Sequence, residues 1–127
     1  MSKFQRGRRA QVSQETQRHE ITKKRVVYQI PGMDAVPVRR DLEYQVTDVG
    51  VLTMDLYYPP DSQREARIPA IVFVVGYPDP GAEKRIGCKF KEMESYISWG
   101  QLTAASGLAA ITYATGKEPA VAVIGPL

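Results

Sequence analysis

Apolar and polar residues alternate most regularly between residues 42 and 58. A period of two residues is typical of a half-buried strand. Residues 48–50, Asp-Val-Gly, have the composition of a tight turn between two such strands. The pattern predicts two antiparallel strands, about residues 42–48 and 51–58. The alternating apolar positions are Tyr44, Val46, Leu52, Met54, Leu56 and Tyr58.

An unbroken apolar run covers residues 70–75, between Pro69 and Gly76. The run is too short for a globular helix, and its β-branched and aromatic residues suit a strand buried on both faces. We therefore expect a central strand that ends in a loop rich in Gly and Pro. Open α/β sheets bind ligands at such strand ends, but a purely structural turn has the same composition.

The segment after this loop has the pattern of two short helices and a further strand. Residues 77–89 are expected to form a long loop, and apolar spacing predicts a helix over about 90–97. Ser98 and Gln101 form a capping-box pattern, which predicts a second helix over 99–106. Gly107 is expected to end it in a left-handed conformation. Residues 108–113 are again apolar and predict a buried strand.

The order strand, loop, helix, strand from residue 70 to residue 113 predicts a β-α-β crossover, which pairs its two strands in parallel. Together with the hairpin before it, this order places the chain in the α/β class. We expect an antiparallel N-terminal hairpin that leads into a mostly parallel sheet.

Charge divides the chain into two parts. Residues 1–25 carry eight Lys and Arg against two Glu, a net charge of +6, so the remainder of the chain carries −3 of the total of +3. We expect residues 1–25 to be a basic, disordered arm and residues 26–127 to be the folded domain. Phosphate binding by Arg6, Arg8 and Arg9 is one interpretation of the arm, and a solvated tail is the simpler one. The mildly acidic domain argues against a nucleic-acid partner.

Composition also argues against several kinds of site. The single cysteine, Cys88, has no intramolecular partner, and with the single histidine, His19, it cannot form a Cys/His zinc site. The carboxylates Asp55, Asp61 and Asp79 fall in separate segments, and no G-x-G-x-x-G or Walker pattern is present. We therefore expect no metal and no other cofactor, and an inert thiol at Cys88.

The sequence carries no sign of a membrane protein. No apolar run approaches the roughly 20 residues that span a bilayer, and the N-terminus lacks the apolar core of a secretory signal. We therefore expect a cytoplasmic protein with no membrane partner.

Three segments resemble the N-terminal part of an α/β-hydrolase, closest to the dienelactone-hydrolase-like or acyl-peptidase-like esterases. Residues 55–61 read DLYYPPD, residues 68–76 read IPAIVFVVG, and residues 98–110 read SWGQLTAASGLAA. In that family they would be a D-x-Y-x-P strand, the strand before the H-G loop, and a helix that ends A-x-x-G before the next strand. The resemblance covers roughly residues 39–113.

The resemblance implies acyl transfer by a Ser-His-Asp mechanism, in which backbone N–H groups bind the oxyanion. One of these donors belongs to the loop after the third strand. By position that donor is the N–H of Tyr77 or, less favoured, of Gly76. Val75 stands where the family usually has His, so a plain strand-ending turn stays an alternative.

The nucleophile elbow of the family, G-x-S-x-G, is absent from these 127 residues. His19 lies in the basic arm, so no catalytic residue is assigned. We expect an N-terminal fragment, or a truncated or frameshifted hydrolase, that is inactive alone. Its full-length relative would act on a small-molecule ester or acyl substrate. The alternative is a non-enzymatic interaction module, which uses the basic arm or self-associates through an open sheet edge.

Overall fold

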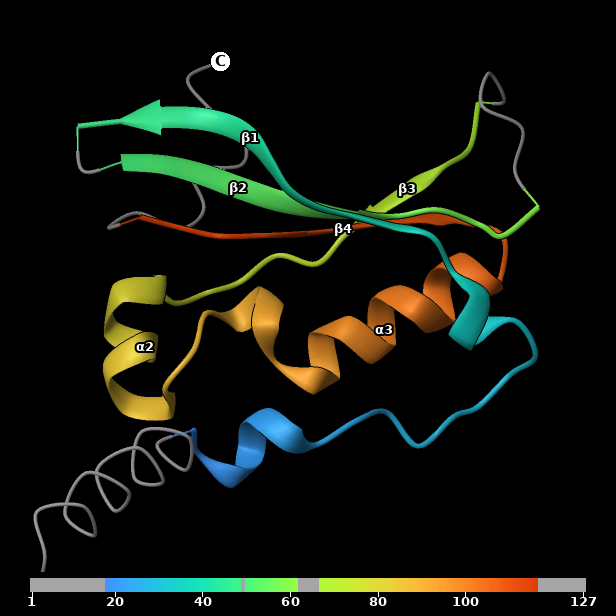
Figure 1. The fold of residues 1–127 in the computed structure, drawn as a ribbon, viewed down its shortest axis with the longest axis horizontal. Coiled ribbons are helices and arrows are strands. Elements are labelled where there is room, and N and C mark those ends of the chain that lie inside the picture. Colours follow the sequence, from blue (N-terminus) through green and yellow to red (C-terminus); the bar gives the residue numbers. More distant parts are fainter. Residues whose placement is uncertain (1–17, 49, 62–66, 117–127) are drawn as a thin grey trace, which may run out of the picture.

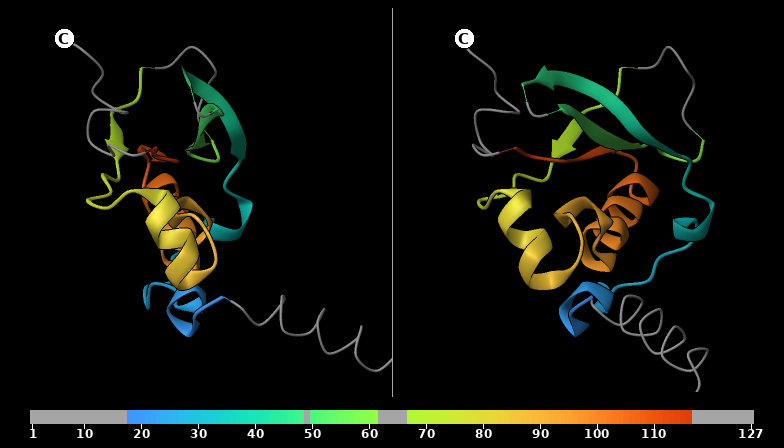
Figure 2. Two further views of the ribbon diagram at one scale, coloured as in Figure 1. Left: turned by 90° about the vertical axis from the view of Figure 1, so that its left-hand side faces the viewer. Right: turned by 60° about the vertical axis from the view of Figure 1, so that its left-hand side comes forward.

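The computed structural model describes residues 18–48, 50–61 and 67–116, and Figure 1 shows their arrangement. The described residues form one mixed sheet of four strands, with the helices on one of its faces (Figures 1 and 2). The elements are η1 (Glu20–Lys23), η2 (Met33–Ala35), β1 (Val38–Thr47), β2 (Gly50–Tyr57), β3 (Ala70–Val72), α2 (Asp79–Ile86), η3 (Phe90–Glu92), α3 (Glu94–Ala105) and β4 (Ala109–Tyr113).

The sheet has the strand order β1-β2-β4-β3. β1 and β2 pair in antiparallel orientation, as the alternating pattern predicts. β2 also pairs antiparallel with β4, and only β3 and β4 are parallel. The expectation of a mostly parallel sheet is therefore wrong for the described residues, because β2 and not a crossover strand is the second neighbour of β4. The parallel pair is joined through α2, η3 and α3, which form the expected crossover.

The buried face of β2 is the polar one. Asp55 and Tyr57 are buried, whereas Leu52, Met54 and Leu56 on the other face are only partly buried. The reason is that the helices cover only the face that carries Asp55 and Tyr57. Among the described residues, the second face of the sheet has no helical layer over it (Figure 2).

The apolar run over residues 70–75 is not a central strand. β3 lies at the edge of the sheet, and its Ile71 and Val72 are 40% and 38% exposed. Beyond it the chain stays beside β4, because the Phe73 N–H donates to the Ile111 carbonyl at 3.0 Å. The prediction of burial on both faces is wrong because the described residues supply no layer over the second face of the sheet.

The core lies between β2, β4 and α3. Tyr57, Ala104 and Ala110 are fully buried there, and Phe73 packs against them. A Cβ atom at Gly100 would lie 2.8 Å from the Tyr57 ring, so the glycine lets α3 approach the sheet at this point. The small residues of α3 thus make room for one large aromatic ring.

The helices differ from the predicted ones at both ends of the crossover. The predicted loop over residues 77–89 contains α2, whose first turn includes Pro80 and whose end is Gly87 at φ +90°. Proline and glycine look like helix breakers in the sequence, but proline is favoured in a first helical turn and glycine directly after the last one.

The two helices predicted over residues 90–106 are one short 3-10 turn, η3, and one continuous helix, α3. Ser98 lies inside α3 and is not its N-cap. Its hydroxyl donates to the Ser95 carbonyl at 3.1 Å and accepts the Val26 N–H at 3.0 Å. Gly107 follows the helix at φ +100°, which confirms the left-handed stop.

Residues 18–25 of the expected arm contact the helices. The His19 N–H donates to the Ile86 carbonyl at 2.9 Å, and Arg25 forms an ion pair with Glu94 at 2.5 Å. Thr22 is buried. The remainder of the arm, with Arg6, Arg8 and Arg9, lies outside the described residues, as do residues 117–127.

Candidate functional site

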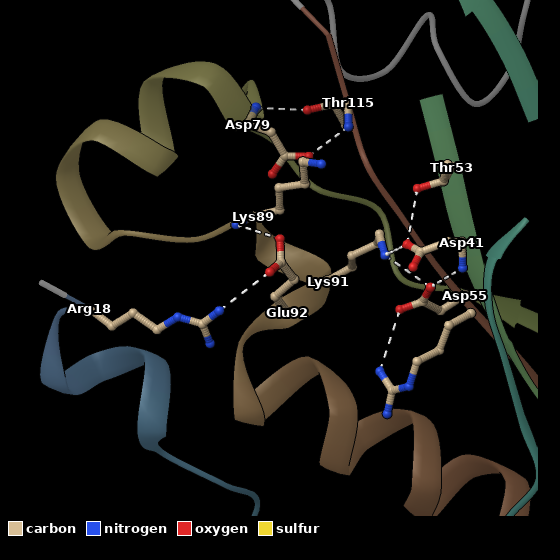
Figure 3. Close-up of polar contacts among 10 residues, drawn as sticks. Arg18, Asp41, Thr53, Asp55, Asp79, Lys89, Lys91, Glu92 and Thr115 are labelled. Atoms are coloured by element: carbon tan, nitrogen blue, oxygen red, sulfur yellow. Dashed lines mark hydrogen bonds and ion pairs between the residues drawn. The ribbon is translucent and has the colours of Figure 1, made fainter. Parts of the chain in front are cut away.

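The carboxyl ends of β3 and β4 meet at one edge of the sheet, because the two strands are parallel neighbours. Asp79, the first residue of α2, joins the segments that follow them. Its carboxylate accepts the Thr115 N–H at 2.6 Å and the Phe90 N–H at 3.0 Å. Its own N–H donates to the Thr115 hydroxyl at 2.8 Å. This buried clasp fixes the end of the loop that leads from β3 to α2, and Figure 3 shows its bonds between Asp79 and Thr115.

The predicted oxyanion donors lie in that loop, two and three residues before Asp79. Gly76 is exposed, and the side chain of Tyr77 is 73% exposed. Neither N–H has a hydrogen-bond acceptor within residues 18–48, 50–61 and 67–116. A Cβ atom at Gly76 would meet nothing within 4 Å, so the described fold does not itself require glycine here. Both backbone donors are therefore free to bind an anionic oxygen.

A cavity of about 470 Å³ begins at Tyr77. Its volume is within the usual range for small-molecule sites. Most of its wall is apolar, and Arg85 is its one charged residue. The cavity is lined by Tyr77, Pro78, Gly81, Ala82, Arg85, Ile86 and Phe90. The cavity is large enough to hold a small acyl or aryl group, and Tyr77 is part of its wall.

The residue before Gly76 faces the interior. Val75 is buried, and its N–H donates to the Tyr113 hydroxyl at 3.0 Å. The Tyr44 hydroxyl donates to the Ala114 carbonyl, and its ring meets that of Tyr113 edge-on, with centroids 6.4 Å apart. Burial, reinforced by Tyr113 and Asp79, raises the pKa of Tyr44 to about 12. Tyr44 therefore remains a hydrogen-bond donor near neutral pH, and the two tyrosines hold the carboxyl end of β4 against the loop.

A second polar cluster lies between η3 and the hairpin (Figure 3). The buried ammonium of Lys91 lies 2.8 Å from Oδ1 of Asp41 and 3.0 Å from Oδ1 of Asp55. Asp41 has a left-handed backbone, φ +58°, at an irregular point of the β1–β2 pairing. This conformation lets the Asp41 N–H donate to Asp55 at 2.9 Å. The sequence gives little sign of this cluster, apart from an aspartate in an alternating strand.

Asp41 and Lys91 stabilise each other's charged forms. The hydrogen bond and the charge of Lys91 lower the pKa of Asp41. Burial opposes the charge on Lys91, but its bonds to Asp41 and Asp55 outweigh this effect and raise the pKa of Lys91. A protonated ammonium has no free electron pair, so Lys91 is not a nucleophile. Its role is to tie η3 to the hairpin.

The other candidate residues have structural surroundings. Nδ1 of His19 accepts the Ile21 N–H at 3.1 Å at the start of η1. Cys88 is buried, and this burial raises the pKa of its thiol. Within the described ranges no group of three or more His, Cys, Asp or Glu could hold a metal ion. In the same ranges no helix is both long enough and apolar enough to cross a bilayer.

Comparisons of this chain with protein-family models, with curated proteins and with solved structures found no match. A functional interpretation therefore depends on the residues and the geometry described above.

Proposed function

We propose that this chain is the N-terminal part of a serine hydrolase that acts on ester or similar acyl bonds, and that residues 73–78 form its oxyanion loop. The observation that carries the proposal is the pair of backbone N–H groups at Gly76 and Tyr77. They lack acceptors in the described chain and lie between the third strand and the following helix. An α/β-hydrolase takes one oxyanion donor from that position.

The arrangement of the sheet supports the same proposal. The sheet of order β1-β2-β4-β3 contains an antiparallel hairpin and a parallel pair joined through helices, which are the elements that the resemblance implies. Within residues 18–48, 50–61 and 67–116, one face of the sheet has no helical layer and the outer side of β3 has no partner strand, and further helices and strands would pack at these two places. Apolar residues at those positions agree with a sheet that continues.

In the proposed mechanism, a serine outside this chain attacks the carbonyl carbon of the ester, and the histidine of the triad, also outside this chain, takes the hydroxyl proton and later gives it to the leaving alcohol. The carbonyl oxygen becomes an oxyanion, and the Tyr77 N–H donates a hydrogen bond to it. The second donor would be the N–H of the residue after that serine. The cavity next to Tyr77 would hold part of the substrate. The 127-residue chain alone has no G-x-S-x-G, so we expect it not to hydrolyse an activated ester such as p-nitrophenyl acetate.

The decisive experiment uses the longer protein that carries the nucleophile. Tyr77→Pro removes the N–H donor, and Tyr77→Ala keeps the N–H but removes the side chain. We expect Tyr77→Pro to lower kcat roughly 100- to 1000-fold relative to Tyr77→Ala, the usual effect of losing one oxyanion donor. Equal kcat values for the two folded variants would remove Tyr77 from the oxyanion site. Circular dichroism of both variants would show that they fold.

The second candidate is a non-enzymatic interaction module, favoured by the exposed edge strand. Ile71 and Val72 are partly exposed at the free side of the sheet, and such an edge can pair with another chain. This alternative predicts a dimer of the full chain that Val72→Lys dissociates, measured by sedimentation equilibrium. If Val72→Lys leaves the association constant unchanged, the edge is not the interface. Salt-sensitive binding to an anionic partner that is lost on deletion of residues 1–17, which leaves the contacts of residues 18–25 in place, would instead assign the interaction to the basic arm.

A further inference from the structure

On the side of the helices away from the sheet, an extended segment brings three exposed apolar side chains together. Val27 is 92% exposed, Tyr28 is 70% exposed, and Trp99 of α3 is 45% exposed. With Lys24 they line a hollow of about 290 Å³, whose other lining residues are Arg25, Val26 and Ser95. The segment begins after η1, on the far side of the helices from the sheet (Figure 2). We call Lys24, Val27, Tyr28 and Trp99 the outer patch.

Specific bonds hold this segment on α3. The Val26 N–H donates to the Ser98 hydroxyl at 3.0 Å. The Arg25 guanidinium bonds to Glu94 at 2.5 Å and to the Gln101 side-chain oxygen at 2.8 Å. The segment directly before Val27 and Tyr28 is therefore fixed on the helix that carries Trp99, and the exposed side chains are held close together.

The charge around the outer patch is positive. Three glutamates lie near this segment, and each forms an ion pair with a lysine or an arginine of residues 18–25. Lys24, in contrast, has no ion pair within the described residues. The pairs are Lys23–Glu20, Arg18–Glu92 and Arg25–Glu94. Residues 1–17, which precede this surface in the chain, carry four Lys and Arg against one Glu. The carboxylates of the three ion pairs are each neutralised by a cation, so they do not repel an anionic partner strongly.

We infer that the outer patch binds the surface of an anionic lipid bilayer. Tryptophan and tyrosine favour the boundary between lipid and water, because each has an apolar ring and a polar atom. Lysine and arginine are attracted to anionic headgroups. Val27 distinguishes this surface from a phosphate or nucleic-acid site, since an exposed aliphatic side chain gains nothing from phosphate but gains free energy in the acyl region.

This inference is independent of the proposed hydrolase function and differs from the expectation of no membrane partner. That expectation rests only on the lack of a spanning segment and of a secretory signal. A peripheral contact needs neither, and two weak signals together, one apolar and one basic, are enough for reversible binding. The apolar side chains of the outer patch supply one signal, and Lys24 supplies the other.

Trp99 is the only tryptophan of the chain, so its fluorescence reports directly on the outer patch. The full chain is titrated with vesicles of phosphatidylcholine that contain about one quarter phosphatidylserine, and with vesicles of pure phosphatidylcholine. We expect a blue shift of Trp99 emission and sedimentation with the anionic vesicles, both reduced by added salt. Brominated acyl chains should quench Trp99 in the anionic vesicles.

Matched variants separate the patch from general charge. Val27→Ser should weaken vesicle binding about tenfold, the loss of one buried valine side chain. Lys24→Gln should weaken it about fivefold. Val46→Ser is the control, because Val46 is 76% exposed on β1, away from the outer patch. It should leave the binding constant unchanged. Circular dichroism verifies that each variant is folded.

Three results would overturn the inference. The first is the absence of any sedimentation with anionic vesicles. The second is sedimentation that neither shifts Trp99 emission nor responds to Val27→Ser, which would assign binding to the basic arm alone. The third is an equal Trp99 shift and equal affinity with soluble polyglutamate, which would identify an acidic polypeptide as the partner.

Discussion

The side chain of Asp79 connects the segments that form the candidate site. It is buried, and it joins the start of α2 to Phe90 and to Thr115. A buried carboxylate that accepts hydrogen bonds from two backbone N–H groups satisfies both donors, and each would destabilise the fold if it were buried without an acceptor. The position of Gly76 and Tyr77 therefore depends on a residue that does not itself face a substrate.

Replacing Asp79 tests this role. Asp79→Ala leaves the Phe90 and Thr115 N–H groups without their acceptor, so we expect the free energy of unfolding to fall by roughly 3 kcal/mol. Asp34→Ala, at an exposed position of η2, is the control and should change it by less than about 0.5 kcal/mol. Urea denaturation measures both. Equal effects of the two substitutions would show that the clasp contributes little.

The Lys91 cluster makes stability depend on pH at both extremes. The pKa of Asp41 is lowered in the folded state, so its contribution is present above the ordinary value of 3.8 and is lost as pH falls through the folded value. The pKa of Lys91 is raised above 10.5, so its contribution is present below that value and is lost as pH rises through the folded one.

We therefore expect the free energy of unfolding to be greatest between these limits. Lys91→Met should reduce its dependence on pH at both the acid and the alkaline end. Asp41→Asn, the matched variant, should flatten the acid limb more than the alkaline one, because Asp55 still contacts Lys91. Unfolding midpoints in urea from pH 2 to pH 11 give the profiles, a range set by the two pKa values. A Lys91→Met profile parallel to that of the unmodified chain would contradict this account.

At this scale the sequence is a poor guide. Asp55 occupies a strand position whose neighbours at 54 and 56 are apolar, so the pattern places it on the polar side. Its burial depends on Lys91, which lies 36 residues away in the chain. A pairing over that separation has no local signal, and neither does the left-handed Asp41 that completes it.

Among the elements, α3 fits the sheet only where its side chains are small. Gly100→Ala places a Cβ atom 2.8 Å from the Tyr57 ring. We expect the overpacking to cost about 1–3 kcal/mol of unfolding free energy, although alanine is the better helix former. Gly81→Ala in α2 meets nothing within 4 Å and should instead stabilise the chain by about 0.4–1 kcal/mol.

Thermal unfolding of the two glycine variants provides the measurement, and the opposite signs are the expected result. The double variant Gly100→Ala with Tyr57→Leu should be less destabilised than the sum of its single variants, because the ring that clashes is gone. Additive effects would mean that the contact between Gly100 and Tyr57 does not determine how closely α3 approaches the sheet.

Local patterns predict some elements and miss others for identifiable reasons. The β1–β2 hairpin is confirmed, because strand period and turn composition are both local properties. The helix α2 lies in the segment predicted as a long loop, because Pro80 is compatible with the first turn of a helix and local composition does not distinguish the two. The prediction that β3 is buried on both faces is wrong, because burial depends on the layers that pack over the sheet, and a local apolar run does not report them. The loop of Gly76 and Tyr77 lies at the end of β3 as expected, but its oxyanion role stays a prediction.

At the scale of the whole molecule, the described sheet is covered on one face only. The other face has a hollow of about 260 Å³, lined by Tyr44, Met54, Val72, Ile111 and Tyr113. An apolar sheet face of this kind normally packs against another layer. In the proposed hydrolase this layer would come from further segments.

The measurement that tests the central claim most directly is the sequence of the coding DNA beyond codon 127, translated in all three frames. The account predicts a strand followed by G-x-S-x-G, with an Asp and a His further along. That result would make Gly76 and Tyr77 the oxyanion loop of a serine hydrolase. The absence of this motif from every frame would contradict the hydrolase proposal, and the chain would then be a stand-alone α/β module.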